Sequence, residues 1–271
     1  MNRITLTNDK GAHARISEYG AQLLKWTTST GKDWVFLSKL AQFESGKAIR
    51  GGVPIIFPQF NEFGPGPRHG FARTHLWQRC DQNDAGENQV TFQLSSSEQT
   101  YRQWPHHFSA FFSVKLIYDQ LIMKLTVINT DNKPLEFTAA LHTYFAVSVF
   151  KNVRLSGLNG TVYWDNDGSD FDKRFTFTDT ELRFDAAIDR IFFNVTKPLL
   201  LQDEEAALGI TMTGFEDVVV WNPGEAGAKA LQDLADEEYT RMVCVEAAVI
   251  DRPIRLQPEQ QWEGTQVLTQ A

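Results

Sequence analysis

Two ionisable residues interrupt otherwise apolar stretches of the sequence. His142 lies within residues 137–147, and Glu246 lies within Met-Val-Cys-Val-Glu-Ala-Ala-Val at residues 242–249. Titratable side chains are seldom buried without a partner. An imidazole, whose ordinary pKa lies near neutrality, and a carboxylate in one low-dielectric cleft can act as general acid and general base. A hydrogen-bonded structural role for His142 and an outward-facing position for Glu246 are the simpler alternatives, and these contexts alone leave them open.

Residues 49–77 combine turn-forming residues with hydrogen-bond donors. Their glycines and prolines, with Gly-Pro-Gly-Pro at residues 64–67, fix turns and let the backbone approach a ligand closely. Arg50, His69 and Arg73 add side chains that can donate to a polar or anionic ligand. The pattern predicts a ligand-binding loop system, and the alternative is a solvated loop whose arginines form surface ion pairs.

The spacing of the remaining chemistry-bearing residues does not favour metal or nucleotide sites. The histidines show no zinc-binding spacing with a partner carboxylate or cysteine. Sequences of the form GxGxxG, GxxxxGK[ST] and GxSxG do not occur. We therefore expect neither a metal ion nor another cofactor at the site.

The net charge and the cysteine content limit which partners and which cellular compartment are expected. The chain has 271 residues, with 26 Lys and Arg against 34 Asp and Glu, so its formal net charge is −8. This balance disfavours nucleic acid and anionic membrane surfaces as partners. The two cysteines, Cys80 and Cys244, do not form a disulfide framework and fit a reducing compartment. Because the sequence shows neither a signal-peptide pattern nor a run of ~20 apolar residues, we expect a soluble, cytoplasmic protein.

Alternation of apolar and polar residues with period two dominates the chain and predicts half-buried strands. The predicted strands are residues 16–26, 89–95, 114–118, 123–127, 137–147, 153–158, 190–195, 217–221 and 242–249. Helical patterns are few: a short helix at Ser97–Gln103, ended by Pro105, and helical composition at Ala230–Tyr239, whose acidic run at residues 236–238 is expected to be a solvated face or loop. Many short strands without long helices predict an all-β antiparallel sandwich or barrel, in one domain over residues 1–271.

The same alternation decides which way the two ionisable side chains face. In residues 137–147, His142 shares a face with Ala140 and Tyr144. In residues 242–249, Glu246 shares a face with Cys244. If both faces of these strands are covered, the histidine and the glutamate lie in a cleft of low dielectric constant.

Six motifs in a fixed order resemble the glucose-6-phosphate 1-epimerases, or hexose-6-phosphate mutarotases, of the aldose 1-epimerase superfamily. They are Arg50–Pro54 (RGGVP), His69–Arg73 (HGFAR), Leu141–Phe145 (LHTYF), Asp189–Asn194 (DRIFFN), Val220–Gly224 (VWNPG) and Val243–Glu246 (VCVE). The similarity extends from about Ile16 to Ile250. Six ordered motifs are far more specific than any one of them.

The resemblance implies the galactose-mutarotase-like fold, a large antiparallel β-sandwich with few short helices, and a set of roles. His142 matches the family's acid that protonates the ring oxygen, and Glu246 matches the base that acts on the anomeric hydroxyl. His69 matches a second histidine near the ring oxygen. Asp189 matches a carboxylate that holds sugar hydroxyls.

Arg50 and Arg73 match the pair of arginines that grips the 6-phosphate and separates this branch from mutarotases of free sugars. Two guanidinium groups can also overcome the repulsion between a net charge of −8 and a phosphomonoester of about −1.5 to −2. The sequence departs from the family at Phe57–Phe60 (FPQF) and at Ala247–Ala248, next to the sugar pocket. We expect Phe57, Phe60 or Trp221 to stack on the sugar; these last three side chains complete the predicted site.

The implied activity is interconversion of the α and β anomers of a hexose 6-phosphate, D-glucose 6-phosphate first, without a cofactor. The implied partner is that small molecule alone, and a monomer is compatible with it. Two alternatives stay open at this point. One is a mutarotase of unphosphorylated aldoses, and the other is a non-catalytic carbohydrate-binding or regulatory β-sandwich.

Overall fold

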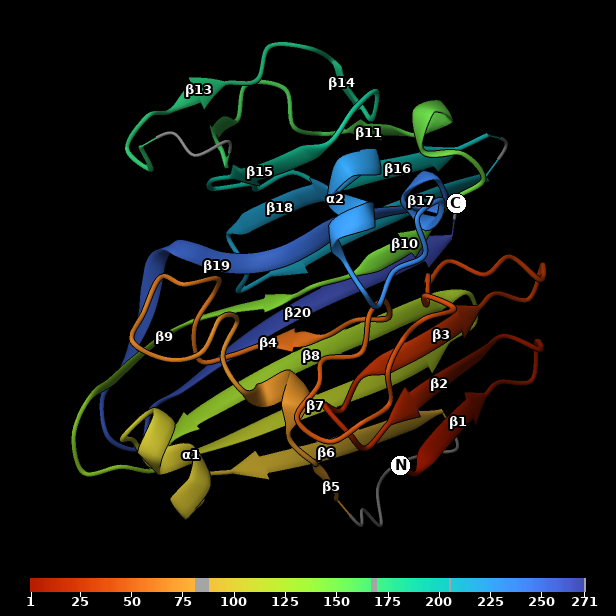
Figure 1. Cartoon of the computed structure of the whole chain (residues 1–271). Helices are drawn as coiled ribbons and strands as arrows, with labels where there is room; N and C mark the ends of the chain where they lie inside the picture. The colour runs from red at the N-terminus through yellow and green to blue at the C-terminus, as the bar shows by residue number, and fades with distance from the viewer. Residues whose placement is uncertain (81–87, 167–169, 205, 271) are drawn as a thin grey trace.

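A computed structural model of the chain describes residues 1–80, 88–166, 170–204 and 206–270. Two large antiparallel sheets and one small sheet make up most of the described chain (Figure 1). One large sheet has the order β14 (Glu181–Arg183), β11 (Arg154–Ser156), β16 (Leu199–Asp203), β17 (Ala206–Thr213), β20 (Gln261–Gln270), β8 (Gln120–Asn129), β7 (Phe108–Ile117), β6 (Gln89–Ser95) and β5 (Gln78–Arg79).

The second large sheet carries the residues on which the argument about function rests. Its order is β13 (Phe175–Thr176), β12 (Val162–Asp165), β15 (Ile188–Phe192), β18 (Asp217–Asn222), β19 (Met242–Leu256), β9 (Leu135–Leu141) and β4 (Ile55–Ile56), with β10 (Tyr144–Ala146) also paired to β19. We call this the site sheet. The small sheet has the order β1 (Arg3–Thr7), β2 (His13–Ser17) and β3 (Leu23–Thr27).

Helices are short. They are the α-helices α1 (Glu98–Gln103) and α2 (Gly224–Ala230) and the 3₁₀ turns η1 (Ala72–Thr74), η2 (Phe150–Asn152) and η3 (Glu238–Arg241). Helix α1 begins after Ser97, whose hydroxyl accepts from the backbone N–H of Thr100 while the Thr100 hydroxyl accepts from the N–H of Ser97. Figure 1 shows α1 and α2 far apart on the molecule. Within the described residues, no helix is long and apolar enough to cross a membrane.

One hydrophobic core joins the two large sheets. Phe92, Phe112 and Leu125 enter it from one sheet, and Leu141 and Val245 enter it from the site sheet. Each residue two positions along a strand returns to the same face, so the alternating pattern supplies an apolar layer to each sheet. The two layers together form a β-sandwich, and the predicted fold class is confirmed.

The predicted strands and short helix are largely confirmed, with two informative differences. Strand β9 ends at Leu141 and β10 begins at Tyr144, so His142 lies at a break in the predicted strand over residues 137–147. The other difference lies in the acidic run at residues 236–238, which we expected to be solvated.

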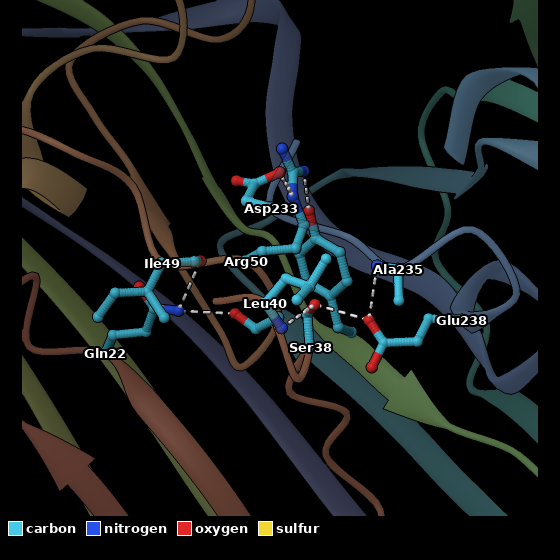
Figure 2. Close-up of polar contacts among 10 residues, drawn as sticks. Gln22, Ser38, Leu40, Ile49, Arg50, Asp233, Ala235 and Glu238 are labelled. Atoms are coloured by element: carbon cyan, nitrogen blue, oxygen red, sulfur yellow. Dashed lines mark hydrogen bonds and ion pairs between the residues drawn. The ribbon is translucent and has the colours of Figure 1, made fainter. Parts of the chain in front are cut away.

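The expectation for that acidic run is wrong for Glu238. This residue is only 4% exposed, and its carboxylate accepts hydrogen bonds from the Ser38 hydroxyl (2.6 Å), the Lys39 N–H (2.9 Å) and the Ala235 N–H (3.0 Å). Figure 2 shows the contacts of Glu238 with Ser38 and Ala235. The carboxylate replaces its lost hydration with these donors, which a pattern of charge along the chain does not reveal.

Candidate active site

A cavity of about 180 Å³ lies on the face of the site sheet that points away from the shared core. Its lining is Arg50, Phe60, Asn61, Arg68, His69, Arg73, His142, Asn166, Asp189, Val219, Trp221, Leu231 and Glu246. All six residues that the sequence predicts for catalysis and substrate binding are in this set. The structure therefore brings together residues that are up to 196 positions apart in the chain, from Arg50 to Glu246.

Strand register explains why side chains from β15, β18 and β19 meet on one face. Asp189 pairs with Trp221, and Trp221 pairs with Cys244 on β19. Glu246 lies two residues beyond Cys244, opposite Val219 of β18. Because residues two apart on a strand share a face, Asp189, Trp221 and Glu246 all point into the cavity. We call these strand residues, together with His142, the floor of the cavity.

His142 and Glu246 form a close pair on this floor. His142 Nδ1 lies 3.3 Å from Glu246 Oε1, and the two residues are 8% and 1% exposed. Within the described chain, His142 Nδ1 and Glu246 Oε2 are buried without a well-aligned hydrogen-bond partner. Buried polar atoms are normally satisfied, and both residues line the cavity, where a ligand can supply partners for them.

His142 is positioned by its backbone and by two aromatic rings. Its backbone N–H donates to the carbonyl oxygen of Pro54 (3.0 Å), and its ring stacks on Tyr144 with centroids 4.7 Å apart and an interplanar angle of 9°. The edge of Trp221 faces the same imidazole at 6.0 Å. These contacts fix the orientation of the imidazole before any ligand binds.

Burial shifts the two pKa values in opposite directions. The pKa of Glu246 is raised well above its ordinary value, first by burial and then by the negative charge of Asp189. Burial also lowers the pKa of His142 well below its ordinary value, and the positive charges of Arg73 and Arg50 add to this effect. With its pKa lowered in this way, the imidazole of His142 is neutral at pH 7.

His69 is neutral as well, and its tautomer can be assigned from its hydrogen bond. Its Nδ1 accepts from the backbone N–H of Asn61 (3.2 Å), which places the ring proton on Nε2. Burial lowers the pKa of His69 to about 2, with further lowering by the nearby arginines. Its ring lies 6.0 Å from that of His142, so Nε2–H is available as a donor beside the proposed acid.

The backbone at His69 and Gly70 turns sharply. His69 has a φ of 64°, and Gly70 has a φ of 67°. A Cβ at residue 70 would lie 2.1 Å from the carbonyl oxygen of Phe57, so only glycine fits there. This turn accompanies the placement of His69 in the lining of the cavity.

Arg50 is bound by fixed partners on the protein. Its Nε donates to Asp233 Oδ1 (3.1 Å) and one terminal nitrogen donates to the Tyr144 hydroxyl (2.9 Å). Figure 2 shows Arg50 directed at Asp233. The same Tyr144 stacks on His142, so this arginine is connected to the proposed acid through one aromatic ring.

Arg73 is held differently from Arg50. One terminal nitrogen donates to the carbonyl oxygen of Arg68 (3.1 Å), and its Nε is buried without a hydrogen-bond partner. Among the residues that the structure describes, no carboxylate lies within 4 Å of this guanidinium. Burial, with the charges of Arg50 and Arg68, lowers the pKa of Arg73 to about 10, so it remains cationic at neutral pH. A cation held in this way favours an anion in the cavity.

Asp189 sits at the polar end of the floor beside Asn166. The Asn166 amide donates to Asp189 Oδ2 (2.8 Å), and the Asn166 backbone N–H donates to the Asp189 carbonyl oxygen (2.8 Å). Burial raises the pKa of Asp189 to about 6. A carboxylate fixed by one amide keeps acceptor capacity free for hydroxyl groups of a ligand.

Sequence analysis did not predict several residues that line the cavity, and it wrongly assigned one aromatic residue to it. Arg68, Asn61 and Asn166 line the cavity without having been predicted. Arg68 directly precedes the HGFAR motif, which is the only signal that could have found it. Phe60 and Trp221 do line the cavity, whereas Phe57 is fully buried in the sandwich core against Trp104 and cannot stack on a ligand.

Comparisons with known proteins identify the class to which this fold and cavity belong. A "Putative glucose-6-phosphate 1-epimerase" of Cenchrus ciliaris is 35% identical over 97% of this chain and 83% of its own length. A protein of the same name from Escherichia coli K12 is 35% identical over 87% of this chain and 79% of its own. The crystal structure titled as a "putative mutarotase" from Salmonella typhimurium superimposes with a TM-score of 0.86 at 30% identity, covering 96% of this chain and 87% of that one.

The sequence profile of the family described as aldose 1-epimerase matches residues 2–269. The chain belongs to the aldose 1-epimerase family and is an enzyme of the epimerase class. The predicted fold and family are thereby confirmed. The roles of individual residues stay predictions, because similarity of whole chains does not test them.

Proposed function

We propose that this enzyme interconverts the α and β anomers of a hexose 6-phosphate, with D-glucose 6-phosphate as the first candidate. The observation that carries the proposal is Arg73, a cation that has no carboxylate partner within the described part of the chain and lines the cavity that also contains the His142–Glu246 pair. The printed names of the relatives from Cenchrus ciliaris and Escherichia coli point to the same substrate. Its cytoplasmic location and its oligomeric state stay predictions from the sequence.

The proposed mechanism uses only proton transfers between the sugar and the floor of the cavity. Glu246 takes the proton of the C1 hydroxyl while an N–H of His142 gives a proton to the ring oxygen. The C1–O5 bond breaks, and the open-chain aldehyde forms. Rotation about C1–C2 presents the other carbonyl face. Reclosure returns one proton from O5 to His142 and one from Glu246 to O1, so the enzyme is unchanged and no redox or group-transfer step is needed.

The shifted pKa values suit this exchange. A raised pKa makes Glu246 a stronger base than an ordinary carboxylate, and the positive charge of Arg73 opposes part of the rise that burial causes. Because positive charge lowers the pKa of His142, a phosphate dianion bound beside the arginines is expected to raise it again. The substrate itself thus favours protonation of the acid.

The experiment that tests the proposal is NMR magnetisation exchange between anomers. Glucose 6-phosphate, galactose 6-phosphate, glucose and galactose are compared, each against its enzyme-free rate, before and after dialysis against a chelator. The proposal predicts a large enhancement for a 6-phosphate that survives chelation. A larger enhancement for a free sugar would identify an aldose mutarotase, and none for any sugar would identify a non-catalytic carbohydrate-binding protein.

A further inference from the structure

We propose that Arg68 is a third phosphate-binding arginine and sets the preference of the site for phosphorylated over free sugars. The inference deepens the proposed function and rests on it. It assigns a substrate contact to a residue outside the Arg50 and Arg73 pair.

Those two arginines are partly engaged by protein partners. Arg50 already uses Nε on Asp233 and one terminal nitrogen on Tyr144. Arg73 uses one terminal nitrogen on the Arg68 carbonyl oxygen. A phosphomonoester dianion carries three strong acceptor oxygens, and bidentate guanidinium pairs are its most favourable partners. A further arginine at the cavity would supply a further bidentate set of donors and a further positive charge.

Arg68 is placed to supply them. Its side chain lines the cavity and is otherwise exposed, and within the described chain no carboxylate lies within 4 Å of its guanidinium. Its charge acts on two other residues of the lining: it adds to the effect of burial in lowering the pKa of His69, and it opposes the rise that burial causes in the pKa of Asp189. An exposed arginine that merely solubilised the surface would not have to line the cavity with those groups.

The backbone that carries Arg68 is anchored on both sides. Gln59 is only 6% exposed; its Oε1 accepts from Gly66 N–H (2.7 Å), and its Nε2 donates to the carbonyl oxygens of Gly66 and Asn61 (both 3.1 Å). The N–H of His69 donates to the same Asn61 oxygen (2.9 Å). Little backbone entropy is therefore lost when the free side chain of Arg68 closes on an anion.

Arg68 also offsets the electrostatic repulsion between an acidic enzyme and an anionic substrate. The protein carries a net charge of −8, which repels a phosphate at long range. An exposed arginine at the cavity contributes a local positive potential that salt screens strongly. Its contribution should therefore fall with ionic strength, unlike that of the more buried Arg73.

Binding of inorganic phosphate tests this without any turnover. Isothermal titration calorimetry at low salt compares wild type with Arg68→Ala, Arg68→Lys and Arg79→Ala, a control that removes an exposed arginine outside the cavity lining. We expect Arg68→Ala to weaken phosphate binding about tenfold, Arg68→Lys to restore part of the loss, and Arg79→Ala to match wild type. The loss should shrink at high salt. Wild-type phosphate affinity in Arg68→Ala would overturn the proposal.

Steady-state kinetics separate this inference from the proposed function. Arg68→Ala should raise KM for glucose 6-phosphate about tenfold, leave kcat almost unchanged, and leave turnover of free glucose unaltered. An equal loss on glucose would show that Arg68 supports the loop rather than the phosphate. If wild type failed to turn over any hexose 6-phosphate but Arg68→Ala still lost phosphate binding, the proposed function would fall while the anion site would stand.

Discussion

The floor and the loops around the cavity are built by different physical means. His142, Asp189 and Glu246 are on, or directly beside, strands of the site sheet, where the alternation of side chains fixes their direction. Arg50, Arg68 and Arg73 come from the loops and the short 3₁₀ turn of residues 49–75, which we call the rim. Rim side chains are oriented by individual hydrogen bonds, such as those of Arg50 to Asp233 and Tyr144.

This difference assigns separate tasks to the two regions. Proton transfer depends on sub-ångström geometry, which a sheet braced on its far side by the sandwich core can hold. Phosphate binding needs charge and donors but tolerates adjustment, which loops can provide. Changes to the floor should therefore lower kcat, and changes to the rim should raise KM.

Substitution of the proposed base should have the largest effect. Glu246→Gln keeps the shape of the side chain and its hydrogen-bonding capacity but removes the proton acceptor, so kcat should fall at least about 10²-fold with little change in KM. His142→Asn should lower kcat similarly. Kinetics of anomer exchange on glucose 6-phosphate provide the measurement.

The double variant Glu246→Gln/His142→Asn sharpens that test. Acid and base act in one step, so the double variant should lose far less than the product of the two single losses. Near-normal kcat in Glu246→Gln would refute the assignment, and Asp189 would be the next carboxylate to examine.

On the rim, Arg73→Ala should raise KM for the 6-phosphate by about 10- to 100-fold, the loss of a charge-assisted hydrogen bond. Arg50→Ala should act in the same direction, although loss of its bond to Tyr144 can also disturb the ring stacked on His142. Free glucose serves as the control substrate. An equal loss on glucose and glucose 6-phosphate would show that these arginines support structure.

The pH dependence of kcat/KM should reflect the ionisation of Glu246 in the floor. Because burial raises the pKa of Glu246, the carboxylate needed as base is lost at a higher pH than for an ordinary glutamate. The value of kcat/KM should therefore fall on the acid side with a midpoint above 4.5. The second ionisation of the substrate phosphate, with a pKa of about 6, also falls in this range. The variant Glu246→Gln separates the two ionisations. Its residual activity should fall at acid pH only because the substrate phosphate becomes protonated.

The smallest effect on activity is expected at Glu238, whose carboxylate contacts Ser38 and Lys39. Glu238→Ala removes the acceptor for Ser38, Lys39 and Ala235 and should lower the free energy of unfolding by about 1–3 kcal/mol. It should leave kcat almost unchanged. The exposed neighbour in Glu237→Ala is the control, measured by thermal and urea unfolding. Equal stability of the two variants would show that the buried carboxylate contributes nothing.

The floor was easier to predict from sequence than the rim. Period-two alternation correctly placed His142 on the same face as Tyr144 and Glu246 on the same face as Cys244, because side chains two residues apart in a strand point to the same side of the sheet. The rim depends on contacts between distant segments: Glu238 and Asp233 reach back to residues 38–50, and Phe57 turns into the core. The pKa of His142 likewise depends on arginines that no local pattern places beside it.

The most direct test of this division of tasks compares Glu246→Gln and Arg73→Ala at limiting and saturating glucose 6-phosphate. Magnetisation exchange gives the anomer interconversion rate for each variant at both concentrations, with wild type alongside. We predict that both variants are slow at limiting substrate, that Arg73→Ala recovers the wild-type rate at saturation, and that Glu246→Gln does not. Recovery of Glu246→Gln at saturation, or an Arg73→Ala rate that stays equally low there, would contradict the account.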